Sequence, residues 1–184
     1  MRHSWRIGRI FGIDINIDSS WLVIFILFSW ILSTTYFPQR FPDWSQGLSW
    51  IIGTITSLLI FASVLVHELA HSLVAIGQGE KVRNITLFLF GGVAQISEEP
   101  KKPWREFTLA LVGPLTSLAL AFVFFVLSLI LSGMSAPVRA LLSYLATINL
   151  VLAIFNLLPG FPTDGGRVLR AIVWKVTGNL RKAT

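Results

Sequence analysis

The sequence predicts an α-helical polytopic membrane protein with about four full spans, a partial fifth span, and short β-strands at the cytoplasmic membrane face. The composition is one reason, because 54% of the residues are hydrophobic and only 13% are charged, which is more apolar than a soluble domain requires. The spacing of the charges is the other. Four stretches without Lys, Arg, Asp or Glu are each long enough to cross a hydrocarbon core, which takes roughly 20 helical residues: 19–39, 44–67, 107–138 and 140–163.

Residues 1–18 are expected to form a small β region outside the membrane. Apolar and polar residues alternate strictly over 13–18, which is the period of a half-buried strand. Gly8 and Gly12 offer places for a bend, so a hairpin or an edge strand is predicted here. The first span should follow over 19–37 and lead into an outer loop that contains prolines.

The second span is predicted over 48–76, because Gly77 and Gly79 suit a helix C-terminus. Residues 81–97 are too polar and too short for another span. Their β-branched and aromatic content, with a Gly-Gly pair in the middle, predicts two short strands around a turn or kink.

The remaining spans are predicted over 107–131 and 138–158, with the start of a fifth helix over 165–176. Proline and glycine after the fourth span end it, and the fifth helix is apolar enough to enter the membrane but too short to cross it. Gly113-Pro114 in the third span indicates either an ordinary helix kink or close packing against a functional helix. Residues 1–184 read as a single membrane-embedded core.

The net charge of +6 reflects membrane orientation rather than nucleic-acid binding. If the N-terminus is cytoplasmic, all fifteen lysines and arginines except Arg40 and Arg139 fall on the cytoplasmic side, as the positive-inside rule requires. Basic residues scattered over short loops do not form the stripe that nucleic acid needs. We expect a multi-pass protein of a prokaryotic plasma membrane with its N-terminus and functional end cytoplasmic, which the lack of a targeting segment and of cysteine fits.

Two of the three histidines, His67 and His71, lie in the predicted second span. On a helix, residues four apart share one face, so both imidazoles can bind one metal ion. Ionisable groups at membrane depth are costly and therefore indicate a functional site. A catalytic zinc has three protein ligands and one open position, so the pattern requires a third ligand.

Asp164 is the acidic residue left for that position. The remaining histidine lies in the N-terminal arm, and the glutamates from Glu80 to Glu106 all fall in one predicted surface connection. Asp164 is the only acidic residue after them, and it follows a span that ends on the same side as the second span. The alternative is that Asp164 caps the helix starting at Gly165.

Glu68 is predicted to be a general base rather than a ligand. It is rotated about 100° around the helix from His67, where its carboxylate can take a proton from the attacking water and pass it to the leaving amine. The alternative is that it only orients a ligand. Asn156 can donate its amide to the carbonyl oxygen under attack, or it can satisfy free carbonyls of a helix broken before Pro159.

The run His67-Glu68-Leu69-Ala70-His71, followed by the run Asn-Leu-Leu-Pro-Gly-Phe-Pro-Thr-Asp-Gly-Gly over 156–166, resembles the paired motifs of the site-2 protease family of intramembrane zinc metalloproteases. Gly113-Pro114 matches the family habit, and the resemblance covers about residues 5–176. It implies one zinc per chain bound by His67, His71 and Asp164, a general base at Glu68 and a substrate-polarising role for Asn156. It also implies cleavage of a membrane-spanning helix of another protein in regulated intramembrane proteolysis.

The opening, residues 7–13, resembles the branch of this family that often carries CBS domains. Family cores generally have about six spans, whereas this chain stops soon after the fifth begins and has no CBS domain. We therefore expect a C-terminally shortened core whose predicted metal ligands are all present. The expected partners are a transmembrane segment of a substrate and the lipid bilayer; homo-oligomer formation is left open.

Residues 89–96 are predicted to present substrate. A peptide bond in a membrane helix must be unwound before it is cut, and extended backbone is tolerated in lipid only when its polar groups find partners. A free strand edge bent at Gly91 and Gly92 and continuing through Val93 and Ala94 can provide them by strand addition. The alternative is a surface hairpin that only anchors the fold.

Two other functions fit some of the pattern. A membrane-anchored metalloprotease that cuts surface segments would usually take a later glutamate as third ligand, and no glutamate follows residue 106. A metal transporter or metal-binding membrane protein needs polar groups through both leaflets, whereas the first and third predicted spans carry no charge.

Overall fold

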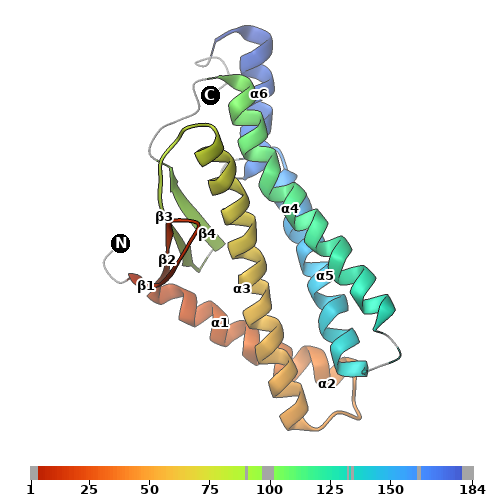
Figure 1. Cartoon of the computed structure of the whole chain (residues 1–184). Coiled ribbons are helices and arrows are strands. Elements are labelled where there is room, and N and C mark those ends of the chain that lie inside the picture. Colours follow the sequence, from red (N-terminus) through yellow and green to blue (C-terminus); the bar gives the residue numbers. More distant parts are fainter. Residues whose placement is uncertain are drawn as a thin grey trace.

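A computed structural model describes residues 4–89, 91–96, 102–131, 133, 135–160 and 163–179. Six helices, one π-helical turn and four strands make up this part of the chain (Figure 1). In chain order the elements are β1 (Ser4–Ile10), β2 (Ile13–Asp18), α1 (Ser19–Ile31), η1 (Leu32–Tyr36), α2 (Phe37–Arg40), α3 (Gln46–Gly77), β3 (Val82–Phe88), β4 (Gly91–Ile96), α4 (Pro103–Ile130), α5 (Ala136–Leu157) and α6 (Asp164–Thr177).

Four helical segments within the described residues are long and apolar enough to cross a membrane. The first is continuous through the π-helical turn, and the four run over Ser19–Arg40, Gln46–Gly77, Pro103–Ile130 and Ala136–Leu157. Together with the short α6 and the small sheet, they confirm the predicted fold class of four spans, a partial fifth helix and short strands.

The ends of these helices follow local sequence signals. The Asp18 side chain accepts a hydrogen bond from the Ser20 amide and caps α1, and Ser45 caps α3 in the same way. Gly79, just beyond the end of α3, has φ +88°, a conformation that glycine adopts without strain. The third membrane helix begins at Pro103 rather than at residue 107, because proline is favoured in the first helical turn.

The four strands form one sheet in the order β1-β2-β3-β4. β2 and β3 are parallel with Ile15 opposite Ile85, and the two outer pairs are antiparallel. Ile13, Ile15 and Ile85 form a buried cluster with Leu69 of α3, so the alternating sequence of β2 directs its isoleucines onto this helix. The predicted strand segment 81–97 thus forms β3 and β4, except that residues 90 and 97 lie outside the described residues.

Helix α3 runs through the middle of the molecule, with the sheet on one side and α4 and α5 on the other (Figure 1). α4 and α5 lie side by side, and α6 lies along the beginning of α4 at the end of the molecule that carries the sheet. This arrangement brings one face of α4 against the part of α3 that carries His67 and His71.

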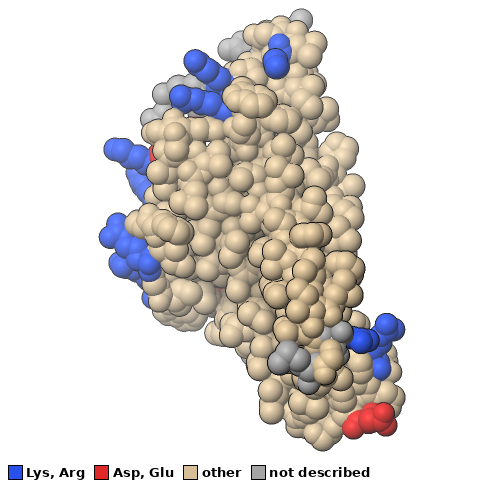
Figure 2. Space-filling view, turned by 45° about the vertical axis from the view of Figure 1, so that its right-hand side comes forward, with Lys and Arg blue, Asp and Glu red and all other residues tan. Residues whose placement is uncertain are grey.

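Charged and apolar surfaces are separated along the length of the molecule. In Figure 2, lysine and arginine side chains gather over the sheet and the α6 end, a smaller charged group lies at the opposite end, and the surface between carries almost none. Large apolar side chains are exposed on the membrane-length helices, among them Val23, Phe122 and Ile154. This distribution suits a protein whose middle is surrounded by lipid.

Candidate metal centre

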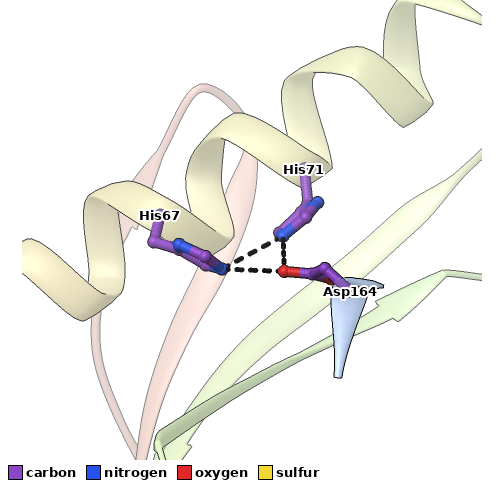
Figure 3. A group of neighbouring side chains, drawn as sticks. All are labelled: His67, His71 and Asp164. Carbon is purple, nitrogen blue, oxygen red and sulfur yellow. Dashed lines mark hydrogen bonds and ion pairs between the residues drawn. The ribbon is translucent and has the colours of Figure 1, made fainter. Parts of the chain in front are cut away.

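His67 and His71 project from one face of α3 and are 4% and 5% exposed. Asp164, from the first turn of α6, lies against both rings (Figure 3). Its Oδ2 is 3.2 Å from the Nε2 of each histidine, and the two Nε2 atoms are 3.2 Å apart. The i, i+4 spacing and the elimination of other acids predicted these three residues, and the structure brings their side chains together.

The start of α6 is packed so tightly that both residues after Asp164 must be glycine. A Cβ atom built on Gly165 would overlap the carbonyl groups of Leu157 and Leu158, and one built on Gly166 would overlap the carbonyl of Gly160. The chain leaving α5 therefore crosses directly over the first turn of α6. Asp164 lies inside this turn, after the N-cap Thr163, so its carboxylate is free to face the histidines instead of capping the helix.

Helix α4 sets the orientation of both imidazole rings. The Nδ1–H of His71 donates to the Leu109 carbonyl at 2.6 Å, and His67 Nδ1 lies 2.9 Å from Ser117 Oγ. Because a carbonyl only accepts, the proton of a neutral His71 resides on Nδ1, and we assign the same tautomer to His67. The lone pairs of both Nε2 atoms then point at the space they share with Asp164.

Gly113 of α4 lies directly beneath the two rings. A Cβ atom at this position would lie 2.6 Å from His71 Cε1 and 2.7 Å from His67 Nε2, closer than packed atoms allow. The Gly113-Pro114 pair therefore permits close packing against the helix that carries His67 and His71. Leu109, Gly113 and Ser117 are four residues apart and share one face of α4.

The donor set fits a zinc ion. Two imidazole nitrogens and one carboxylate oxygen are the ligands of many catalytic zinc sites. In a tetrahedral site with bonds of about 2.0 Å, neighbouring ligand atoms are about 3.3 Å apart, and all three separations here are 3.2 Å. Two nitrogen lone pairs and a carboxylate oxygen facing one another at this distance repel unless a cation lies between them.

The carboxyl group of Asp164 is ionised in this environment. Burial raises the pKa of this carboxyl group, but when the His67 and His71 rings are protonated, their hydrogen bonds and positive charge lower it by a larger amount, so the pKa then lies well below the usual range of an aspartate. Asp164 therefore contributes a negative charge to the group at neutral pH.

Glu68 lies beside the three residues and not among them. It follows His67 on α3 and contacts β4: a Cβ atom on Gly92 would lie 2.5 Å from Glu68 Cγ and 3.1 Å from Cδ. The absence of a side chain at Gly92 thus leaves room for the Glu68 side chain between α3 and the sheet. The strand predicted to present substrate and the predicted general base are in contact.

Asn156 is half-buried near the end of α5, where its Nδ2 donates to the Leu152 carbonyl at 3.0 Å. This bond lies within its own helix, and its role toward substrate stays a prediction. Residues 161 and 162 of the same motif lie outside the described residues.

The sequence did not reveal several residues that support this site. Leu109 acts through its backbone carbonyl, which has no sequence signature, and Ser117 is one of many small residues in its span. Asn149 of α5 is fully buried and donates to Ser63 Oγ at 3.2 Å, one helical turn before His67. An asparagine in the middle of an apolar span was a signal for such a contact.

The structure corrects the prediction made for Glu106. It was assigned to a surface connection, but it lies in the first turn of α4 and is 1% exposed. Arg170 of α6 binds its carboxylate, with Arg170 Nε donating to Glu106 Oε1 at 2.6 Å. Pairing with a cation is what allows a carboxylate to be buried at this position.

Comparison with known proteins identifies the family. Residues 55–137 and 132–184 match the model of peptidase family M50. The chain is 47% identical to "Putative zinc metalloprotease sll0528" of Synechocystis sp. over 99% of this chain and 47% of the relative. It is 35% identical to "Zinc metalloprotease MJ0392" of Methanocaldococcus jannaschii over 98% of this chain and 49% of the relative. The chain thus spans about half the length of the curated relatives it matches.

A solved structure has the same fold. The site-2 protease from Methanocaldococcus jannaschii superposes with a TM-score of 0.61 at 34% identity, covering 94% of this chain and 73% of the other. The likeness therefore covers nearly the whole of this chain. The chain belongs to peptidase family M50, the site-2 protease family of membrane zinc metalloproteases.

Proposed function

We propose that this chain is the core of an intramembrane zinc metalloprotease that hydrolyses a peptide bond within or near a transmembrane segment of a membrane protein, in regulated intramembrane proteolysis. The observation that carries the proposal is the convergence of His67, His71 and Asp164 at 3.2 Å inside a group of membrane-length helices. Family membership and the names of the relatives support the same activity.

The residues of the site divide the chemistry among them. Zinc, when bound by His67, His71 and Asp164, supplies Lewis acidity to the attacking water and the scissile carbonyl. Glu68 accepts a proton as the water oxygen bonds to the carbonyl carbon, and it gives that proton to the leaving nitrogen when the C–N bond breaks. Asn156 donates its amide to the carbonyl oxygen as negative charge develops there.

A cleavage assay with the purified protein in liposomes tests this function. Single-span substrates should be cut within or near their transmembrane segment, as mass spectrometry of the products would show, and a chelator should stop the reaction. Equal cleavage of a soluble unfolded protein would favour the surface metalloprotease instead. Zinc flux across the liposome membrane without any cleavage would favour the transporter.

We further assign substrate presentation to β4. Gly91, Gly92, Val93 and Ala94 belong to this strand, which lies at the edge of the sheet among the described residues. Its contact with Glu68 through Gly92 supports an arrangement in which an unwound substrate pairs with the outer edge of β4. The carbonyl to be cut would then lie close to the general base.

Proline substitutions in β4 test this assignment. The backbone N–H groups of neighbouring residues in a strand point to opposite edges of that strand. Of Val93 and Ala94, one therefore has its N–H at the outer edge of β4, and proline at that position removes this donor. We expect slower cleavage with zinc retained, and faster cleavage when helix-breaking residues are placed near the scissile bond of the substrate. If both variants cut at the wild-type rate with zinc bound, β4 has no part in presentation.

The orientation in the membrane is also a proposal: the N-terminus, the sheet and the α6 end face the cytoplasm, because nearly all lysines and arginines then obey the positive-inside rule. The absence of cysteine makes labelling of single introduced cysteines direct. A cysteine at Gln46 should react from the outside and one at Gly77 from the cytoplasm; both positions are exposed. Labelling of both from one side would contradict this topology.

A further inference from the structure

A buried ion pair joins α4 to the helix that carries Asp164. Glu106 is 1% exposed, and Arg170 Nε and Nη2 both bind its Oε1, the Nε at 2.6 Å. The other carboxylate oxygen has no hydrogen-bond partner among the described residues. Removing these charges from water is costly, so such a pair contributes little net stability, and its value lies in the geometry that it fixes.

Glu106 lies on the same face of α4 as the groups that hold the histidines. The spacing from Glu106 to Leu109, Gly113 and Ser117 is three, then four, then four residues, which keeps all four on one side of a helix. Leu109 and Ser117 contact His71 and His67 through hydrogen bonds, and Gly113 lies beneath both rings. Glu106 adds the contact to α6, so this one face of α4 supports all three residues of the centre.

The other directional contacts of α6 lie at its beginning, where Gly165 and Gly166 pack against the chain leaving α5 and Thr163 donates to the Leu158 and Gly160 carbonyls. α6 is 14 residues long, and Leu169, Ile172 and Val176 on it are 49%, 46% and 80% exposed, so one of its apolar faces is uncovered by described residues. Arg170 lies six residues after Asp164, about 9 Å along the helix axis. A helix is stiff over this length, so fixing Arg170 also fixes the end that bears Asp164.

We propose that Glu106 and Arg170 are positioning residues for the metal centre: their ion pair holds α6 in the place where Asp164 meets His67 and His71. This inference rests on the proposed function, because it treats the three residues as zinc ligands. Among the described residues, Glu106 and Arg170 form their hydrogen bond and ion pair with each other and not with His67, His71 or Asp164. We therefore infer that the pair acts through the placement of α6.

Zinc affinity, measured by competition with a chelator on the purified full chain, tests the proposal. Glu106→Gln and Arg170→Gln should each weaken zinc binding about tenfold or more, as the loss of a residue that orients a ligand does. The exchanged pair Glu106→Arg with Arg170→Glu should recover part of the loss. Lys175→Gln is the matched control, since it removes one positive charge from an exposed position of the same helix and should leave zinc affinity unchanged.

A second measurement separates positioning from general stabilisation. Spin labels on cysteines introduced at Trp104 of α4 and Val176 of α6, both exposed, should report a broader distance distribution in Glu106→Gln than in the wild type, with zinc removed from both. Should Glu106→Gln fail to fold, Arg170→Lys, which keeps the charge but cannot place two donors on one oxygen, should still weaken zinc binding. If Glu106→Gln and Arg170→Gln bind zinc with the wild-type affinity, the proposal is wrong. Where Arg170→Lys has to replace them, wild-type zinc affinity in that variant would overturn it in the same way. A wild type without zinc would overturn the proposed function and this inference with it.

Discussion

Replacing Glu68 with glutamine is expected to lower the cleavage rate by about 10²–10⁴-fold, the usual contribution of a general acid or base, while zinc stays bound. Glutamine has nearly the same shape as glutamate, so the contact with Gly92 of β4 should survive. The amide cannot take a proton from water at neutral pH, so the loss should appear in turnover rather than in substrate binding. Cleavage kinetics and zinc content of the same preparation measure both effects.

Asp43→Asn is a suitable control for this substitution. It also replaces a carboxylate with an amide, but it lies on an exposed loop at the other end of α3 and should cut at the wild-type rate. Near-wild-type cleavage by Glu68→Gln would show that Glu68 is not the base.

Gly113→Ala is expected to weaken zinc binding by about 100-fold, the upper range for a change next to metal ligands. The added methyl group would lie 2.6 Å from His71 Cε1 and 2.7 Å from His67 Nε2, so the rings could not keep both their positions and their hydrogen bonds to α4. Alanine favours a helix more than glycine does, so the helix itself should not suffer. The measurement is chelator competition.

Gly47→Ala provides the comparison, because Gly47 is also helical but has open space where its Cβ would be. This variant should bind zinc like the wild type. If Gly113→Ala did so as well, the close packing of α4 against the histidines would not be required for the metal centre.

Much of the fold was predictable because its signals are local. Charges, prolines and glycines mark the ends of membrane helices, so α3 and α5 begin and end within about two residues of their predicted limits. β1 was harder to predict, because a bulge between Arg6 and Gly8 breaks the alternation that reveals β2. The sheet order was also hidden, since β2 and β3 pair across the whole of α1 and α3.

The residues of the site could be predicted where their side chains are of a type that is rare in the surrounding sequence. Two histidines one helical turn apart stand out in an apolar span. Asp164 could then be identified by elimination, because the chain has few acidic residues. Glu106 was placed at the surface because it follows a run of charges, yet its partner Arg170 lies 64 residues away. A pairing over that distance depends on the packing of α6 against α4, which no local pattern encodes.

Zinc content of the purified protein tests the central claim most directly. We predict one zinc per chain for the wild type and for Glu68→Gln, and almost none for His67→Ala, His71→Ala or Asp164→Ala, all measured after the same dialysis. Full zinc content in Asp164→Ala, or no zinc in the wild type, would contradict the assignment of His67, His71 and Asp164 as the metal ligands.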